Sequence, residues 1–425
     1  MWSSNLVALI YAIAVSADSY AGRKTCTVKP SGTNTTDDAP AIRSAFIECR
    51  QHGRIVFEPS TYYINSVLDI QNLHDVDIDF NGELLWSPDI NYWLNASLPV
   101  GYQNQSTAFI MGGDNVRING HGTATFNGNG DYWYEWIKKQ PNTSNFPGRP
   151  HQITFDGLNN SVVKGLNFLR SQMWTMSIIH SYDTVWQDIF INNTGNRLDS
   201  SNTDGVDTFF SANLLFKNWT VYNGDDSFSC KANSTNITLL DSHFYNGLGI
   251  AIGSIGQYND QFETVENIYG ENVYFENTLH AFYMKTWTDD QNGYPPNGGG
   301  GGLGFAQNMV MKNFTIKNMR GAAFSISQCT RFTGAPGQGN CTNSQFQIRD
   351  VAIDGLKGTT KDRRVASLQC SAIVPCTNIS LNDVELKHAQ NETVVPNYLC
   401  GNVVQNRGWE CTGPVCVGGS STGGC

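Results

Sequence analysis

A short pattern recurs along this chain of 425 residues. Each copy contains a run of alternating apolar residues, a turn with Asn or Gly, and a second short run. Copies that begin at Val162, Val185, Leu214, Ile237 and Val265 lie roughly 22 to 29 residues apart, a spacing typical of solenoid repeats. Because one such unit cannot bury its own apolar face, neighbouring units must stack and share a core.

The turns of this repeat favour one kind of solenoid. Asn tolerates the left-handed backbone conformation, and Asn side chains that stack between coils can form hydrogen bonds with one another. Helical periodicity is weak except over residues 38–49, which predict a short amphipathic helix. We therefore predict an all-β fold, a right-handed parallel β-helix rather than a leucine-rich repeat or a propeller. The helix would cap one end, and a disulfide-rich C-terminal tail would close the other.

The charge balance limits the partners of the chain. There are 27 Lys and Arg against 37 Asp and Glu, a formal net charge of -10. This balance argues against nucleic acid and against an anionic membrane as partners. An acidic substrate stays compatible with it, because a local basic pocket can act against the net charge.

The N-terminus predicts export. Residues 1–17 have an apolar core and end in the small residues Val15-Ser16-Ala17. The segment is too short to span a bilayer, so we interpret it as a signal peptide that precedes a single domain over residues 18–425. Asn-x-Ser/Thr sequences and 11 cysteines agree with a secreted, extracellular glycoprotein. The sequences of this type include Asn34, Asn95, Asn104, Asn218, Asn233, Asn313, Asn378 and Asn391.

The cysteines predict several short-range disulfides. The expected pairs are Cys26 with Cys49, Cys329 with Cys341 and Cys370 with Cys376, while Cys400, Cys411, Cys416 and Cys425 would hold the tail. The odd number leaves at least one thiol unpaired. We expect this to be Cys230, buried and inert, because no activating base adjoins it in the sequence.

Carboxylates are concentrated between Asn202 and Asp226. Asp204 and the pair Asp225-Asp226 each lie beside Gly or Asn in a chain that is only 15% charged. On stacked coils these positions would be one coil apart, close enough to act on one substrate bond. Any one of them alone would more often cap a turn. We interpret Asp207 as a turn or supporting residue.

Several motifs carry a resemblance to a known family. They are Asn202-Thr203-Asp204-Gly205, Gly224-Asp225-Asp226, Gly247-Leu248-Gly249 and Lys285-Thr286-Trp287, in this order. Together with Asp37-Asp38-Ala39-Pro40 and Phe126-Asn127-Gly128, they resemble glycoside hydrolase family 28, the polygalacturonases and their rhamnogalacturonan-active relatives. The resemblance spans most of the chain and implies an inverting pectin hydrolase.

The resemblance also implies roles for these residues. Asp225 would be the general acid, while Asp204 and Asp226 would activate water on the opposite face of the sugar. Inversion of this kind usually has roughly 6.5–9.5 Å between acid and base. Two adjacent carboxyls also favour keeping one of them protonated at mildly acidic pH. Asn202 and Lys285 would contribute to substrate binding.

Two positions depart from the family pattern. Leu248 stands where polygalacturonases have His between the two glycines, and Tyr283 stands where they have Arg. The loss of the guanidinium removes a bidentate grip on a galacturonate carboxylate and leaves Lys285 as a single point charge. Tyr283 and Trp287 are candidates to stack on a sugar face, or simply to pack in the core.

The expected activity is that of an exo-acting galacturonidase on homogalacturonan or rhamnogalacturonan. An α-L-rhamnosidase on rhamnogalacturonan is the second choice, and a non-catalytic pectin-binding protein or a pectate lyase on the same fold are further alternatives. Exo action is suggested by the insertion at 289–296, which would wall off one end of the cleft. We expect a monomer with a pectic polysaccharide or oligosaccharide as its partner. The acidic cluster fits no calcium-loop spacing, so we expect no metal and no other cofactor.

Overall fold

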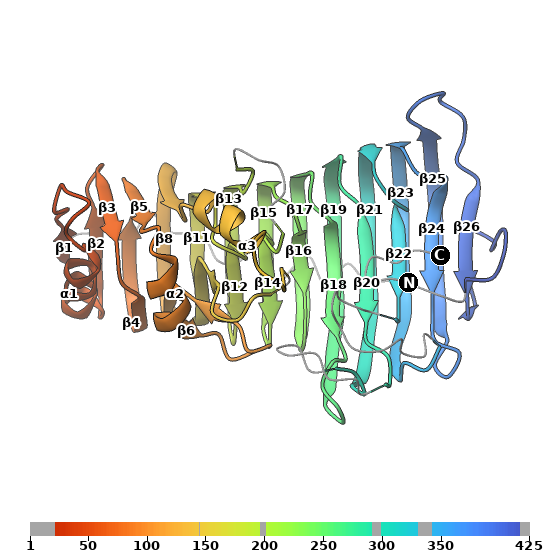
Figure 1. Cartoon of the computed structure of the whole chain (residues 1–425), viewed down its shortest axis with the longest axis horizontal. Coiled ribbons are helices and arrows are strands. Elements are labelled where there is room, and N and C mark those ends of the chain that lie inside the picture. Colours follow the sequence, from red (N-terminus) through yellow and green to blue (C-terminus); the bar gives the residue numbers. More distant parts are fainter. Residues whose placement is uncertain (1–21, 144, 196–200, 291–298, 330–341, 417–425) are drawn as a thin grey trace.

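The computed structural model describes residues 22–143, 145–195, 201–290, 299–329 and 342–416. The predicted signal peptide lies outside these residues. The described chain forms an elongated stack of coils, with strands side by side from one end to the other (Figure 1). Nearly all strands belong to one 24-stranded sheet whose non-consecutive neighbours pair in parallel. The predicted right-handed parallel β-helix is confirmed.

Each coil contributes one strand to each of two long rows. The first row follows the order β1 (Lys24–Val28), β2 (Gly53–Phe57), β4 (Leu68–Asp79), β8 (Phe109–Asn127), β11 (Val162–Leu169), β13 (Tyr182–Asn192), β15 (Ala212–Tyr222), β17 (Ser234–Tyr245), β19 (Phe262–Glu276), β21 (Leu303–Met319), β23 (Phe346–Thr360), β25 (Cys376–His388) and β27 (Val403–Val404).

The second row carries the residues of interest for function. It continues from β8 through β10 (Ile153–Asn159), β12 (Met176–Ile179), β14 (Val206–Phe209), β16 (Asp226–Cys230), β18 (Gly249–Ile255), β20 (Phe282–Thr286), β22 (Phe324–Ser327), β24 (Arg364–Gln369) and β26 (Asn397–Gly401). Near the N-terminal end, β3 (Thr61–Ile64) and β5 (Glu83–Trp86) pair with each other, and β5 pairs with β8. A small separate sheet consists of β6 (Leu98–Pro99), β7 (Ser106–Thr107) and β9 (Pro150–His151).

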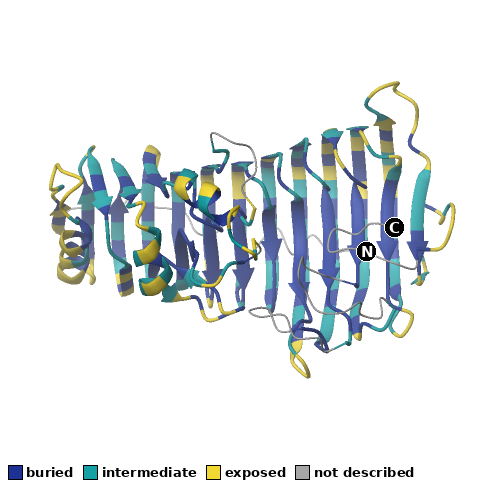
Figure 2. Ribbon diagram, in the orientation of Figure 1, coloured by how far each residue is buried: buried dark blue, intermediate teal, exposed yellow. Residues whose placement is uncertain are grey.

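The core is a set of aligned apolar stacks. Equivalent positions in successive first-row strands are occupied by Leu214, Ile237, Ile268, Met309, Val351 and Ile379. All six are buried, and each contributes roughly 1.5–3 kcal/mol through removal from water. Figure 2 shows the same distribution, with buried strand centres and exposed residues gathered at the rims of the coils.

Asn residues hold the turns in register, as the sequence predicts. Asn213, Asn236, Asn267 and Asn308 have φ between 56° and 60° and form a ladder in which each side-chain amide donates to the previous residue. Successive members are 23, 31 and 41 residues apart. Coil length therefore varies beyond the predicted period, and the step from Asp350 to Asn378 is again only 28 residues. The strands stay aligned through these changes in length.

Helices cover only limited parts of the solenoid. The described residues form three, α1 (Ala39–Cys49), α2 (Ile90–Ala96) and α3 (Asp131–Ile137). The predicted capping helix is α1, which lies at the N-terminal end of the stack in Figure 1 and buries Ile42 and Phe46. Asp38 fastens its start to the first coils by accepting hydrogen bonds from Ser31 N and Tyr63 N, at 2.7 and 2.8 Å. No helix within the described residues is long and apolar enough to cross a membrane.

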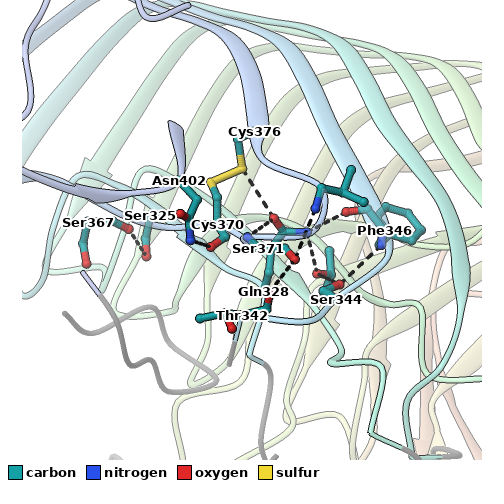
Figure 3. The surroundings of a disulfide bond; sticks show 12 residues. Ser325, Gln328, Thr342, Ser344, Phe346, Ser367, Cys370, Ser371, Cys376 and Asn402 are labelled. Carbon is teal, nitrogen blue, oxygen red and sulfur yellow. Dashed lines mark hydrogen bonds between the residues drawn. A yellow bond between two sulfur atoms is a disulfide. The ribbon is translucent and has the colours of Figure 1, made fainter. Parts of the chain in front are cut away.

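The disulfides follow the predicted short-range pairs where these are described. Cys26 is bonded to Cys49 and Cys370 to Cys376, and Cys400 is bonded to Cys411 in the tail. Around the Cys370–Cys376 bond, Gln328 donates to Phe346 O and accepts from Ser371 N, so the C-terminal coils are tied together (Figure 3). Cys341 and Cys425 lie outside the described residues. Cys230 is free and buried, as predicted.

Candidate active site

Neighbouring coils of the second row bring the predicted acidic residues together. Asp204 lies just before β14, Asp225 and Asp226 lie at the start of β16, and Tyr283 and Lys285 lie on β20. One carboxylate oxygen from each of the three aspartates lies within 4.8 Å of the others. A single small region therefore brings together residues that are up to 81 positions apart in the chain, because successive coils of a solenoid stack directly on one another.

Asp225 is the carboxyl of this group that is open to solvent. It is partly exposed, whereas Asp204 and Asp226 are buried. Its Oδ2 accepts a hydrogen bond from Asn202 N at 3.0 Å, and its Oδ1 accepts one from Asp226 N at 3.0 Å. Burial and the neighbouring Asp226 raise the pKa of Asp225, against the opposing effect of Lys285. These contacts orient an acid that retains its proton more readily than an isolated aspartate.

Asn202 is placed to hold Asp225. Its backbone is left-handed with φ of 56°, and its side-chain oxygen accepts from Asn145 N at 3.0 Å. Its Nδ2 lies 3.4 Å from Asp225 Oδ2, so the side chain bridges a preceding loop and the acid. The turn after it is clamped by Asn223, whose amide donates to the carbonyl oxygens of Thr203, Asp225 and Asp226.

Two side chains of β20 contact the Asp226 carboxylate. Lys285 Nζ lies 2.8 Å from Asp226 Oδ2, and the Tyr283 hydroxyl donates a hydrogen bond to Oδ1 of the same carboxylate. Burial lowers the pKa of Lys285, but Asp226 and Asp225 raise it by more, so that the ammonium stays charged. Tyr283 is 1% exposed, which leaves no ring face open to a sugar in this arrangement. Trp287 is also buried.

Asp204 is also buried. Burial, followed by the charges of Asp225, Asp207 and Asp226, raises its pKa well above the ordinary range. Its Oδ1 has no hydrogen-bond partner in the described part of the structure. Such a buried carboxyl oxygen is costly unless a water or substrate hydroxyl bonds to it.

A second polar layer lies beside the three aspartates. Asp207, on β14, is wholly buried and lies 3.3 Å from Lys231 Nζ, which also donates to Gly253 O at 2.8 Å. Burial raises the pKa of Asp207 to about 7, with Lys231 opposing the rise. The Lys231 ammonium also lies 5.0 Å from the centre of the Trp174 ring. This pair supports the site from within the coil.

Arg149 approaches the aspartates from the loop before β9. Its Nε donates to Gln172 O at 2.7 Å and its Nη1 to Ser201 O at 3.1 Å. Complete burial lowers its pKa to about 10, while Asp204 and Asp225 favour its charged form. The sequence analysis missed both Arg149 and Lys231. The signal for Lys231 was its place directly after the short strand that begins at Asp226. Arg149 reaches the site from a segment with no motif of its own.

The site can therefore perform acid–base chemistry. Four carboxyl groups face three cations, Arg149, Lys231 and Lys285, so the cluster can hold a proton at mildly acidic pH. The same oxygens fit a bound calcium poorly. Calcium takes roughly 6–8 oxygen ligands, whereas one oxygen from each of three aspartates converges here and Lys285 already occupies one face of Asp226.

The fold and the carboxyl cluster define a carbohydrate hydrolase on a parallel β-helix. The model of the family "Glycosyl hydrolases family 28" matches residues 66–406. The chain belongs to this family, and it is a glycoside hydrolase.

Individual relatives agree with this assignment. The chain is 54% identical over 404 residues to the alpha-L-rhamnosidase rgxB of Aspergillus niger, covering 95% of this chain and 93% of that protein. It is 34% identical over 407 residues to another Aspergillus niger protein, and the match covers 89% of this chain and 91% of that protein. The name of that protein gives galacturan 1,4-alpha-galacturonidase as a provisional activity. Among solved structures, the endo-xylogalacturonan hydrolase of Aspergillus tubingensis has a TM-score of 0.74 at 25% identity, covering 92% of this chain and 99% of that chain.

Proposed function

We propose that this protein is a secreted, exo-acting pectin hydrolase that releases terminal α-L-rhamnose from rhamnogalacturonan. We choose rhamnose because Tyr283 and Lys285 both bind the Asp226 carboxylate. A galacturonate residue bound over the aspartates would need a cation for its carboxylate. Lys285, which the sequence analysis assigned to substrate binding, is already paired with Asp226. A neutral 6-deoxy sugar makes no such demand.

The similarity to a named rhamnosidase points in the same direction. The sequence analysis placed galacturonate first and rhamnose second, and the pairing of Lys285 reverses that order in our proposal. Galacturonate release remains the second candidate, because a 34% identical relative carries a galacturonidase name. The insertion at 289–296, from which exo action was inferred, lies largely outside the described residues.

In the proposed mechanism, Asp225 donates its proton to the glycosidic oxygen, and Asn202 orients it. The buried oxygens of Asp204 and Asp226 hold the attacking water, and Lys285 and Tyr283 hold the Asp226 carboxylate in place. The nearest carboxyl oxygens lie within 4.8 Å, closer than the roughly 6.5–9.5 Å typical of inverting enzymes. Inversion is thus proposed from the family resemblance, and proton NMR of the first-formed anomer tests it.

The experiment that tests the proposed function compares nitrophenyl α-L-rhamnoside with the corresponding α-D-galacturonide. Release of nitrophenol from the rhamnoside alone is expected. Release from the galacturonide alone would favour the second candidate, and release from neither, together with binding of pectin oligosaccharides, would indicate a pectin-binding protein. Export, glycosylation and a monomeric state belong to the same proposal, and mass spectrometry and light scattering of the secreted protein test them.

A further inference from the structure

Arg320 is a cation at the rim of the site that the mechanism above does not use. It follows β21 and is exposed, but its side chain reaches back along the stack. Nη2 donates to Asn246 O at 2.7 Å and to Gly247 O at 2.8 Å. Arg320 forms no ion pair with any residue in the described ranges, unlike Lys285 and Lys231 of the site.

The carbonyl oxygens that bind Arg320 belong to the turn that packs on the general acid. Leu248 N donates to Asp225 O at 2.7 Å. A Cβ atom on Gly247 would lie only 2.6 Å from the same oxygen, so this turn is in direct contact with the backbone of Asp225. The dipeptide Gly247-Leu248 therefore contacts both the guanidinium of Arg320 and the backbone of the proposed acid.

The remaining donors of the guanidinium are uncommitted. Of its five N–H groups, only those of Nη2 form hydrogen bonds with described residues, which leaves Nε and Nη1 open. Partial desolvation lowers the pKa of Arg320, and no described acidic group opposes this shift. A partly desolvated cation of this kind binds a carboxylate more strongly than a fully solvated one would.

From this placement we infer that Arg320 binds the carboxylate of the uronic acid on the leaving-group side of the cleaved bond. The inference rests on the proposed function, in which a terminal neutral sugar is removed from a galacturonate residue. The general acid must face the leaving oxygen, so the sugar that carries this oxygen lies beside Asp225 and the Gly247-Leu248 turn. Leu248 is partly exposed there and presents an apolar surface, so Arg320 is the residue of this turn region that binds the carboxylate of the leaving sugar.

The test uses Arg320→Gln and a matched pair of oligosaccharides. One is rhamnosyl-galacturonate with its free carboxyl group, and the other is the same compound with that carboxyl reduced to the alcohol. The parent enzyme should prefer the free acid, and Arg320→Gln should lower the ratio of the two kcat/KM values by about 10- to 100-fold, mainly through KM. Arg320→Lys should restore part of the ratio. Arg363→Gln removes an exposed guanidinium from the next coil and should leave the ratio unchanged.

Two outcomes would overturn the inference. In one, Arg320→Gln lowers kcat/KM for both oligosaccharides by the same factor, which would mean that Arg320 only supports the turn. In the other, the ratio does not change. Failure of the proposed function is recognised separately, because the parent enzyme would then release no rhamnose. In that case the affinities of Asp225→Asn and Asp225→Asn/Arg320→Gln for the two oligosaccharides, measured by calorimetry, decide whether Arg320 reads the carboxylate.

Discussion

The hydroxyl of Tyr283 gives the most specific prediction for the catalytic centre. Tyr283→Phe removes the hydrogen bond to Asp226 and the 3.3 Å contact with Lys285 Nζ, while the ring keeps its packing against His280, at 4.9 Å between centroids. The fold should therefore be preserved. Lys285 remains paired with Asp226, so the carboxylate loses only one of its two fixed partners.

The expected loss follows from the kind of hydrogen bond removed. A hydrogen bond to a charged group contributes roughly 1.5–3 kcal/mol. If Tyr283 holds Asp226 in the transition state, kcat should fall by about 10- to 150-fold. The assay is hydrolysis of nitrophenyl α-L-rhamnoside, with thermal unfolding measured on the same sample to confirm that the fold is intact.

Tyr274→Phe is the matched control. The Tyr274 hydroxyl donates to Glu276 Oε2 at 2.8 Å on β19, a tyrosine–carboxylate bond outside the site. This variant should retain the kcat of the parent enzyme. A kcat of Tyr283→Phe within about twofold of the parent would refute the reasoning. Loss of activity in Tyr283→Leu combined with full activity in Tyr283→Phe would instead show that the buried ring acts through its packing.

Other substitutions test the remaining groups. Asp225→Asn should lower kcat by at least about 100-fold without changing the circular dichroism spectrum, and retained activity would reject Asp225 as the acid. Lys285 lowers the pKa of Asp225, so Lys285→Gln should raise that pKa further and move the alkaline limb of the kcat–pH profile to higher pH, although kcat itself falls; a limb that stays in place or moves to lower pH would contradict this. Burial raises the pKa of Asp207 from 3.8 to about 7, so its contribution to stability is full below pH 4 and is lost as the pH rises through 7. This contribution is at most about 4 kcal/mol, and Asp207→Asn should flatten the dependence of Tm on pH in that window; an unchanged slope would show that Asp207 does not titrate there.

Most of the fold could be predicted because its determinants are local. The alternating apolar residues and the Asn turns recur within each coil, and the disulfides Cys26–Cys49 and Cys370–Cys376 join cysteines close in sequence. The longer coils, such as the one from Asn267 to Asn308, were not predicted. Additional turn residues do not disturb the stack from Ile268 to Met309, so they leave no trace in the strand pattern.

The chemistry of the site was easier to predict than its electrostatics. Asp204, Asp225 and Asp226 lie in two motifs, whereas the partners of Asp226 lie 57 and 59 residues further along the chain. Their pairing depends on the registers that align β16 with β18 and β18 with β20. Sequence analysis assigned Lys285 and Tyr283 to the substrate, and only the structure reveals that both contact the proposed water-activating aspartate.

The identity of the released sugar tests the account most directly. Rhamnogalacturonan oligosaccharides that end in rhamnose and others that end in galacturonate would be incubated separately with the enzyme, with and without a chelator, and the products identified by chromatography and mass spectrometry. We expect free rhamnose from the first set, nothing from the second, and no effect of the chelator. Release of galacturonate, or an unsaturated product formed by elimination, would contradict the account.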